Sequence, residues 1–287
     1  MSDWNVSTTP ASPSRRKLLA AMGAGAGVAW SGSALAQTPA TTLKCSGAYT
    51  DALFHTQNLQ QFASQVGSLT QGATKIEVVS NSKLMPMKDV LPALGKGDLA
   101  LGEIFMSNFG QQYPLLAIDS LPFIVRGFPE AQRLWEATRQ PIQDLLQKQG
   151  VHVLYAAAWP GQGLFSRAPI NKLEDLKGLK FRVNNDATKY IAEVAGALPV
   201  DIAANNLAKA IQAGNVDVMV TSSTTGVDSQ AWNAMGYFID MRAWIPKNLV
   251  CISAQVWAKL PAATKTAMET AAKQAEARSW QLAKDAD

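Results

Sequence analysis

Few side chains in this chain have the types and spacing that catalysis would need. The chain contains two histidines, His55 and His152. It has no Gly-x-Ser-x-Gly turn, no His-Glu-x-x-His or Cys-x-x-Cys motif and no phosphate-binding glycine loop. These absences argue against a hydrolase and against a metalloenzyme. We therefore expect no catalytic residue, no metal site and no cofactor.

Glu103 and His55 are the two groups that could still move a proton. Glu103 follows the predicted strand 99–102, at the edge of an α/β sheet where ligands bind. His55 stands near the start of a predicted helix, where it could cap the helix, line a cleft or be solvated. His152 opens a strand that looks buried, so a structural role is expected for it.

The first 36 residues have the pattern of an export signal. Arg15, Arg16 and Lys17 precede a small and apolar stretch at 20–28, and Ala-Leu-Ala at 34–36 matches a cleavage site. The paired arginines predict the bacterial twin-arginine route. The apolar stretch is shorter than the roughly 20 residues that cross a membrane. We therefore predict a signal peptide over 1–36 and a soluble protein of the periplasm.

Charge and cysteine content narrow the class further. Three of the 26 basic and one of the 22 acidic residues lie in the signal, so 23 and 21 remain. No basic run follows, and a nucleic-acid partner is not expected. Cys45 and Cys251 are the only cysteines, and both lie in apolar stretches. Two buried thiols are the simpler interpretation, with a disulfide as the alternative.

Strands and helices alternate along the rest of the chain, which is typical of an α/β sheet protein. Strands are predicted at 43–49, 75–80, 99–102, 151–157, 180–183 and 216–221. Helices are predicted at 58–66, 87–95, 130–149, 187–195, 207–213 and 261–287. The segments 113–129 and 159–171 are predicted to be irregular. No linker or repeat separates two domains in series, so we expect two interleaved lobes.

An ordered set of motifs resembles the extracytoplasmic solute receptors of tripartite ATP-independent periplasmic (TRAP) transporters, of the dicarboxylate-receptor type. The set includes Leu-Pro-Phe at 121–123, Leu-Lys-Gly-Leu-Lys-Phe-Arg-Val at 176–183, Gly-Ala-Leu-Pro-Val at 196–200 and Ala-Ile-Gln-Ala-Gly-Asn-Val-Asp at 210–217. The resemblance runs from about residue 43 to the end of the chain. Family members usually continue beyond the position that aligns with residue 287, so a truncated sequence is expected.

The resemblance implies a periplasmic-binding-protein architecture with two α/β lobes, a hinge and a long C-terminal helix. One lobe would contain 37–159 and 247–287, and the other 160–246. It also implies a receptor that closes around a small organic acid and delivers it to the membrane permease subunits. A monomer is expected.

The resemblance places Arg182 where the family's arginine forms a two-pronged salt bridge with the ligand carboxylate. The polar residues that it assigns to the ligand beside Arg182 are Gln162, Asn185 and Thr221. Gln162 stands where sugar-acid receptors have a second arginine, and Ala204 and Asn206 stand where many members have an aromatic residue and a glutamate. These departures predict a monocarboxylate, such as a 2-oxo or 2-hydroxy acid with an apolar or aromatic tail.

The remaining candidates for the site could equally belong to the core. They are Trp159, Phe165, Met106 and Trp244, with Phe105 and Leu53 as further apolar candidates and Glu103 and His55 as titratable ones. Two alternative functions stay open at this point. One is a sensor receptor for a membrane kinase, and the other is a secreted enzyme with Glu103 or His55 as general base.

Overall fold

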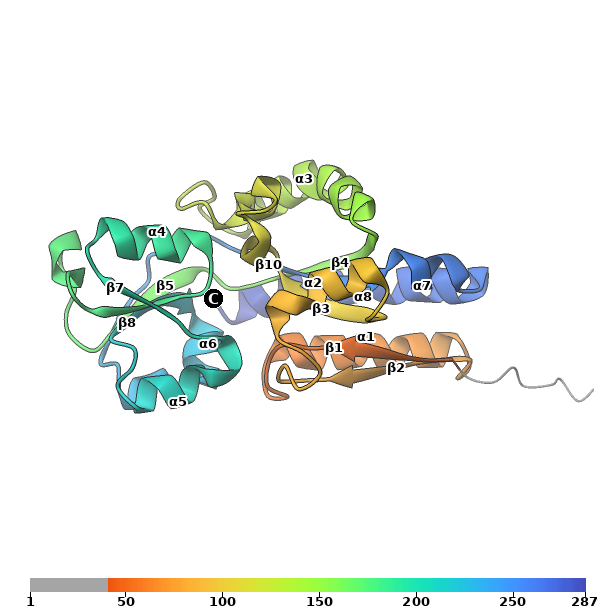
Figure 1. Ribbon diagram of the computed structural model, residues 1–287, viewed down its shortest axis with the longest axis horizontal. Coiled ribbons are helices and arrows are strands. Elements are labelled where there is room, and N and C mark those ends of the chain that lie inside the picture. Colours follow the sequence, from red (N-terminus) through yellow and green to blue (C-terminus); the bar gives the residue numbers. More distant parts are fainter. Residues whose placement is uncertain (1–40) are drawn as a thin grey trace, which may run out of the picture. The chain divides into compact units, whose positions relative to one another are not determined.

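Two five-stranded sheets organise the part of the chain that the computed structural model describes, residues 41–287 (Figure 1). The first sheet has the strand order β2-β1-β3-β10-β4 and the second β7-β6-β8-β5-β9. The strands of the first sheet are β1 (Thr41–Ser46), β2 (Thr74–Val79), β3 (Leu101–Phe105), β4 (Val151–Ala158) and β10 (Lys247–Ser253). Those of the second are β5 (Gln162–Ser166), β6 (Lys180–Val183), β7 (Leu198–Asp201), β8 (Val218–Ser222) and β9 (Tyr237–Ile239). We call the parts built on the two sheets the first lobe and the second lobe. The predicted signal peptide lies outside the described residues.

The two lobes are interleaved in the chain, as predicted. The chain passes from the first sheet to the second between β4 and β5, and it returns between β9 and β10. Within the first sheet β1 is parallel to β2 and β3, whereas β10 is antiparallel to β3 and β4. In the second sheet β6 is parallel to β7 and β8, and β5 is antiparallel to β8 and β9. The carboxyl ends of β3 and β6 therefore supply the loops from which an α/β site is usually built.

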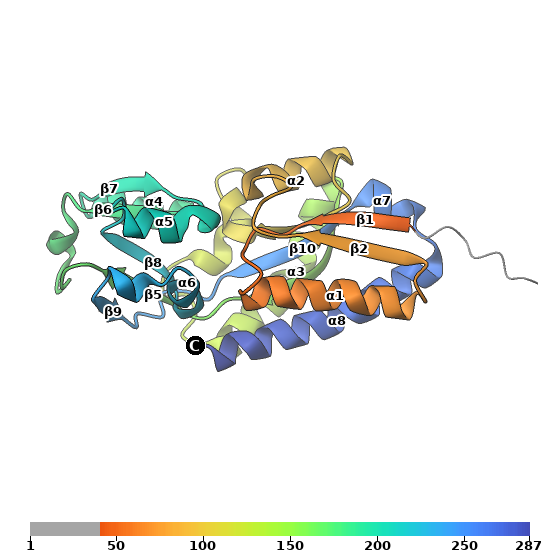
Figure 2. The same ribbon diagram turned by 90° about the horizontal axis from the view of Figure 1, so that it is seen from below.

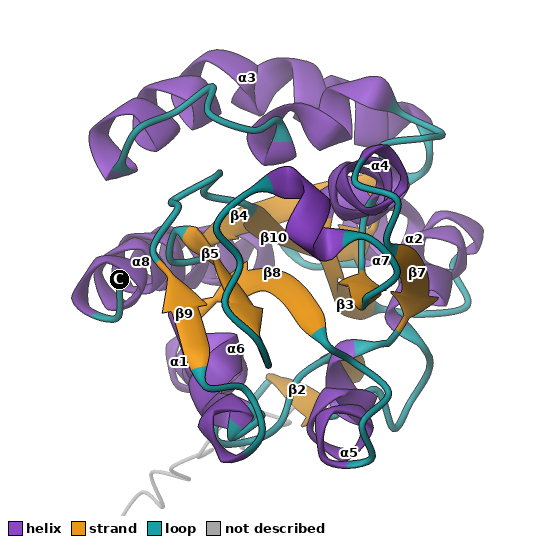
Figure 3. Cartoon of the chain, turned by 90° about the vertical axis from the view of Figure 1, so that its left-hand side faces the viewer, coloured by secondary structure: helices purple, strands orange, loops and turns teal. Residues whose placement is uncertain are grey.

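Helices lie on both faces of each sheet, and the strands β3, β8 and β10 are completely buried. The edge strands β7 and β9 of the second sheet are largely exposed. The α-helices are α1 (Phe54–Leu69), α2 (Met87–Lys96), α3 (Phe128–Lys148), α4 (Asp186–Val194), α5 (Leu207–Gln212), α6 (Ser223–Asp228), α7 (Ala254–Lys259) and α8 (Ala262–Asp285). The short 3₁₀ helices are η1 (Met106–Phe109), η2 (Pro114–Ser120), η3 (Leu173–Leu176), η4 (Ala204–Asn206) and η5 (Ala231–Asn233). In the first lobe, α1 and α8 share a core on one face of the sheet, and α2 and α3 share a core on the other. In the second lobe α4 and α5 lie on opposite faces (Figure 3).

The long helix α8 lies beside α1 along the first lobe (Figure 2). Its buried stripe is mostly small, and Ala271, Ala272 and Ala275 belong to the core that α8 shares with α1. Small side chains at helical spacing let two helices approach closely while still burying apolar surface. The end of α8 reaches the second lobe, where Ser223 Oγ donates to the carbonyl of Ala286 at 2.7 Å.

The two crossings between the lobes are held side by side by backbone hydrogen bonds. The Trp159 N–H donates to the Pro246 carbonyl at 2.9 Å, and the Gln162 N–H donates to the Trp244 carbonyl at 3.0 Å. A buried ion pair lies next to the second crossing, with Lys247 Nζ 3.2 Å from Asp119 Oδ2. The two crossings thus form the connection between the lobes, which we call the paired hinge.

The strands β9 and β10 were not among the predicted strands, and two other element predictions differ from the structure. The segment 159–171 contains the strand β5, although Pro160, Gly161 and Gly163 suggest a loop. Gly163 is needed in that strand because a Cβ there would overlap the Phe238 ring on β9. The first helix begins at Phe54, four residues before the predicted start.

Two further observations concern membranes and thiols. Across residues 41–287, no helix combines the length and the apolar composition needed to cross a bilayer. Cys45 and Cys251 are buried free thiols on β1 and β10, and β3 runs between those strands. Burial raises the pKa of both thiols well above the usual range, so they stay protonated.

Candidate functional site

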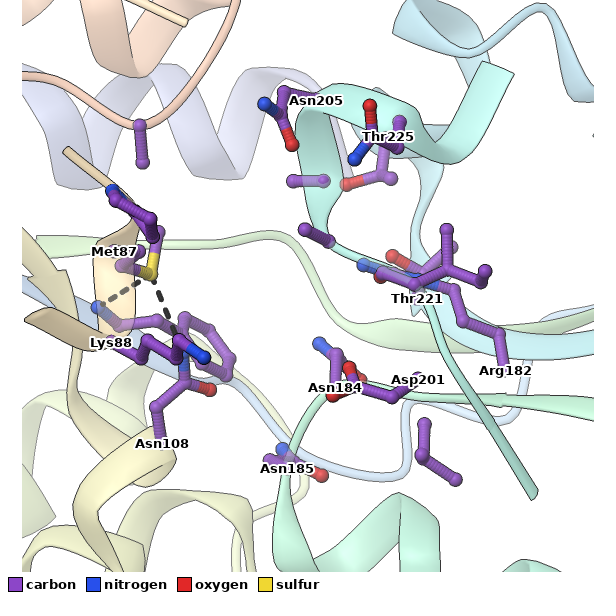
Figure 4. A pocket seen from close by; sticks show the side chains of 18 of the residues that line it. Met87, Lys88, Asn108, Arg182, Asn184, Asn185, Asp201, Asn205, Thr221 and Thr225 are labelled. Carbon is purple, nitrogen blue, oxygen red and sulfur yellow. Dashed lines mark hydrogen bonds between the residues drawn. The ribbon is translucent and has the colours of Figure 1, made fainter. Parts of the chain in front are cut away.

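A cavity of about 780 Å³ lies between the lobes, beside the paired hinge, from which Trp159 and Gln162 line it. Its wall from the first lobe comes from the segment after β1, the start of α2 and the end of β3. Its wall from the second lobe comes from the ends of β6, β7 and β8 and the segments that follow them. In Figure 4, Met87, Lys88 and Asn108 lie on one side of this space and Arg182, Thr221 and Thr225 on the other. The volume suits a small organic ligand.

Arg182 is a buried cation in the wall of this cavity. It lies on β6, where its side chain is 3% exposed. Its Nε donates to the carbonyl of Ile202 at 3.0 Å. Within residues 41–287, no salt bridge involves Arg182 and no hydrogen bond involves its two terminal nitrogens. Nε is therefore anchored, and the fork of the guanidinium is left for a ligand.

Burial lowers the pKa of Arg182 to about 10, and Tyr49 and Asp201 oppose that shift. The guanidinium consequently keeps its proton at neutral pH. A buried charge without a partner is costly, and an anion that accepts two parallel N–H bonds would offset that cost. The positive charge of Arg182 in the cavity wall therefore favours the binding of a carboxylate.

Amide and hydroxyl groups surround Arg182. Gln162 and Thr221 line the cavity from neighbouring strands, and Gln162 Nε2 is tied to the Pro160 carbonyl at 2.8 Å. Asn185 caps α4, since its Oδ1 accepts from the Thr188 N–H at 2.9 Å. These groups can donate to or accept from a neutral polar part of a ligand.

The structure brings five of the ten predicted ligand residues to the cavity and leaves five elsewhere. Those that line it are Arg182, Gln162, Asn185, Thr221 and Trp159. Those that do not are Phe165, Met106, Trp244, Glu103 and His55. Phe165 packs on Phe238 with ring centroids 4.6 Å apart, and Met106 and Trp244 are buried in the cores of the first and second lobes. Of the further apolar candidates, Phe105 lines the cavity and Leu53 does not.

Glu103 and His55 lie behind the cavity wall. Glu103 Oε1 accepts from Asn248 Nδ2 at 2.7 Å and lies 3.7 Å from His55 Nδ1. Burial raises the pKa of Glu103 to about 7, and the Asn248 hydrogen bond opposes the rise. Burial lowers the pKa of His55 to about 3, so its imidazole is neutral. Both side chains are almost fully covered, so neither presents itself to a bound ligand.

The sequence analysis did not predict several of the residues that line the cavity. They are Tyr49, Met87, Lys88, Asn108, Asn184, Asp201, Asn205 and Thr225, among others. Asn184 and Asp201 directly follow or end parallel strands, so the rule for sheet edges could have indicated them. Met87 and Asn108 come from segments that carry no such signal, and only the packing of the two lobes brings them to the cavity.

Comparisons with known proteins identify the family to which this chain belongs. Residues 48–287 match DctP, the bacterial extracellular solute-binding protein family 7. An extracytoplasmic solute receptor of Bordetella pertussis, DctP7, which binds pyroglutamic acid, is 38% identical with a TM-score of 0.84, over 86% of this chain and 82% of its own.

Two further solved structures agree. DctP6 of the same organism, also a pyroglutamic acid receptor, is 34% identical with a TM-score of 0.83, over 85% of this chain and 81% of its own. A TRAP solute-binding protein from an unidentified marine microbe, specific for pyroglutamate, is 28% identical with a TM-score of 0.83, over 86% of this chain and 81% of its own. The chain described here belongs to the DctP family of TRAP-transporter extracytoplasmic solute receptors.

Proposed function

We propose that this receptor captures a small organic monocarboxylate between its lobes, in the periplasm, and delivers it to the membrane permease of a TRAP transporter. The observation that carries the proposal is Arg182, a buried guanidinium whose fork faces the cavity without a protein partner. A carboxylate accepts both parallel N–H bonds of that fork, whereas a neutral group leaves the charge uncompensated.

As a member of this family the chain is a solute receptor and not an enzyme. The burial of Glu103 and His55 behind the cavity wall agrees with that conclusion. The alternative of a secreted enzyme with either residue as general base is therefore set aside.

We propose pyroglutamate as the first ligand to test. Three similar receptors bind it. Its lactam has one N–H donor and one carbonyl acceptor. Gln162 Oε1 can accept from the N–H and Asn184 Nδ2 can donate to the carbonyl, because the hydrogen bonds of these side chains within the protein use their other polar atoms. The apolar surface of Trp159 and Phe105 would cover the ring carbons. A 2-oxo or 2-hydroxy acid with an apolar tail also has one carboxylate that can pair with Arg182. Such acids should be tested with pyroglutamate in one panel of ligands.

Matched pairs of an acid and its amide test the proposal directly. Pyroglutamate and pyroglutamamide differ only in the group that would meet Arg182. Isothermal titration calorimetry on protein freed of bound ligand by unfolding and refolding should show binding of the acid and at least a hundredfold weaker binding of the amide. Equal affinities, or no binding of any carboxylate in the panel, would count against the proposal.

We also propose the lobe boundaries, the monomeric state and the export route predicted above. All strands of the first sheet fall within 37–159 and 247–287, and those of the second within 160–246, which supports the division. Replacing Arg15 and Arg16 together by lysine should stop export through the twin-arginine route. Fractionation of cells that produce the full chain checks this outcome.

A further inference from the structure

Asn248 links two aromatic residues of the cavity wall to the interior of the first lobe. Asn248 lies on β10 and is completely buried. Its Oδ1 accepts from Trp159 Nε1 at 2.9 Å and from the Tyr49 hydroxyl at 3.2 Å. Its Nδ2 donates to Glu103 Oε1 at 2.7 Å. Tyr49 and Trp159 line the cavity, whereas Asn248 and Glu103 do not.

The chemistry of the partners determines the orientation of the Asn248 amide. An indole N–H can only donate, so the atom that it meets must be the carbonyl oxygen. The amide nitrogen is then directed to Glu103, which accepts in its ionised form and through its carbonyl oxygen in its neutral form. One side chain thus satisfies two donors on its cavity side and one acceptor on its interior side.

The same aromatic residues are also held by ring contacts. Trp159 lies 4.1 Å from the His55 ring, centroid to centroid, and packs edge-on against Tyr49 at 5.1 Å. Because His55 covers one face of the indole and Asn248 holds its N–H, Trp159 has little freedom to rotate. The wall that it forms with Tyr49 is accordingly preorganised before a ligand arrives.

We propose that Asn248 is a positioning residue for ligand selection. By holding Trp159 and Tyr49, it gives the receptor a preference for carboxylates with a flat ring over acyclic carboxylates of equal charge. This inference rests on the proposed function, because it takes the cavity to be the ligand site. Arg182 supplies the affinity for any carboxylate, and the wall held by Asn248 distinguishes among them.

The experiment compares a ring acid, pyroglutamate, with an acyclic acid, 2-hydroxybutyrate, by calorimetry. The wild-type receptor should prefer the ring acid. Asn248→Ala should reduce the affinity for pyroglutamate at least tenfold more than that for 2-hydroxybutyrate, so the preference falls. Ser253→Ala, at the other end of β10 and outside the cavity, should change neither affinity by more than about twofold.

Asn248→Asp gives a readout that a merely structural residue would not give. The new carboxylate can accept from Trp159 and Tyr49, but it lies beside Glu103, and two adjacent carboxylates share one proton at low pH. The groups around Glu103 are His55 on α1, Cys45 on β1, Tyr49 after β1 and Tyr155 on β4. Of the cations near this network, Arg182 acts on Tyr49, and Lys247, next to Asn248 on β10, is paired with Asp119. The ring preference of this variant should therefore be close to wild type at pH 5 and lost at pH 8, while the wild type keeps its preference at both.

Tyr49→Phe and Trp159→Phe keep an aromatic ring and remove one donor each, so they test the inference if Asn248→Ala does not fold. Each should lower the ring preference in part. An equal loss of affinity for pyroglutamate and for 2-hydroxybutyrate in these variants would overturn this inference, as would an unchanged ring preference in Asn248→Ala. Neither result would contradict the proposed function. A wild-type protein that binds neither acid would overturn the proposed function as well.

Discussion

Asn185 of the second lobe donates a hydrogen bond from Nδ2 to Ser107 Oγ of the first lobe at 3.2 Å, across the edge of the cavity. A second bond between the lobes joins Thr50 Oγ1 to Asp228 Oδ1 at 2.5 Å. Both bonds require the lobes to be close together. Since a ligand shifts a conformational equilibrium only through contacts that differ between the two states, such bonds favour the closed arrangement.

Ser107→Ala should weaken ligand binding without altering the ligand contacts. The loss of one hydrogen bond between neutral groups costs about 1 kcal/mol, which corresponds to roughly a fivefold change in Kd. Small-angle scattering should show a larger radius of gyration for the ligand-free variant than for the wild type. Asn185→Ala should weaken binding more, because it also removes the cap of α4 and a side chain that lines the cavity. Identical Kd values for Ser107→Ala and wild type would show that this bond plays no part in closure.

Arg182→Ala should weaken carboxylate binding by about 2–5 kcal/mol, or roughly 30-fold to several thousandfold in Kd. Arg182→Lys should recover little of this loss, because an ammonium group cannot present two parallel donors. Titration calorimetry with the ligand identified by the panel measures both variants. Arg133→Ala is the control, since the Arg133 side chain is 70% exposed on α3. A lysine variant with wild-type affinity would contradict the fork geometry proposed here.

The family resemblance located more of the cavity lining than the sheet-edge rule did. Arg182 and Asn185, on and just after β6, came from the resemblance and line the cavity. Glu103, which the sheet-edge rule indicated, lies behind the cavity wall. Phe165 was expected in the wall, yet it faces α5 in the interior of the second lobe, whereas its neighbour Leu164 faces α4. A shift of one residue exchanges the two faces of a strand. No local pattern shows which face of β5 is turned to the cavity.

The fold was easier to predict than the wall of the site for a related reason. The alternation of strands and helices and the motif at 176–183 are local features of the chain. By contrast, Trp159 and Met87 reach the cavity only because segments far apart in sequence pack together. The hydrogen bond between Tyr49 and Asn248 spans 199 residues. Contacts at that separation are set by the packing of the whole first lobe.

Glu103→Gln should make the first lobe less sensitive to pH. Burial raises the pKa of Glu103 from 4.5 to about 7 in the folded protein. The folded state therefore holds this proton more tightly than the unfolded state, and stability falls as the pH rises from about 4.5 to 7. The loss amounts to about 3 kcal/mol in wild type. Glutamine keeps the acceptor for Asn248 and cannot ionise.

Urea unfolding of both proteins between pH 4.5 and 8 measures this effect. The unfolding free energy of Glu103→Gln minus that of the wild type should increase as the pH rises. His55, whose lowered pKa costs stability toward acid pH, is present in both proteins, so its contribution largely cancels in the difference. A difference that stays constant with pH would mean that Glu103 titrates at its ordinary value.

Lys247 and Asp119 should contribute to the stability of the protein through their pairing, and not as two independent charges. Both side chains are 1% exposed and lie at the hinge. Lys247→Met alone should destabilise the protein by about 3–5 kcal/mol, because it leaves the Asp119 carboxylate buried without a cation. The double variant Lys247→Met with Asp119→Leu should regain most of that loss, since two apolar side chains can replace a buried ion pair at little cost. Urea unfolding at pH 7 of the wild type, both single variants and the double variant gives the coupling energy. If the double variant is as unstable as the sum of the singles, the two charges act independently and the hinge does not depend on their pairing.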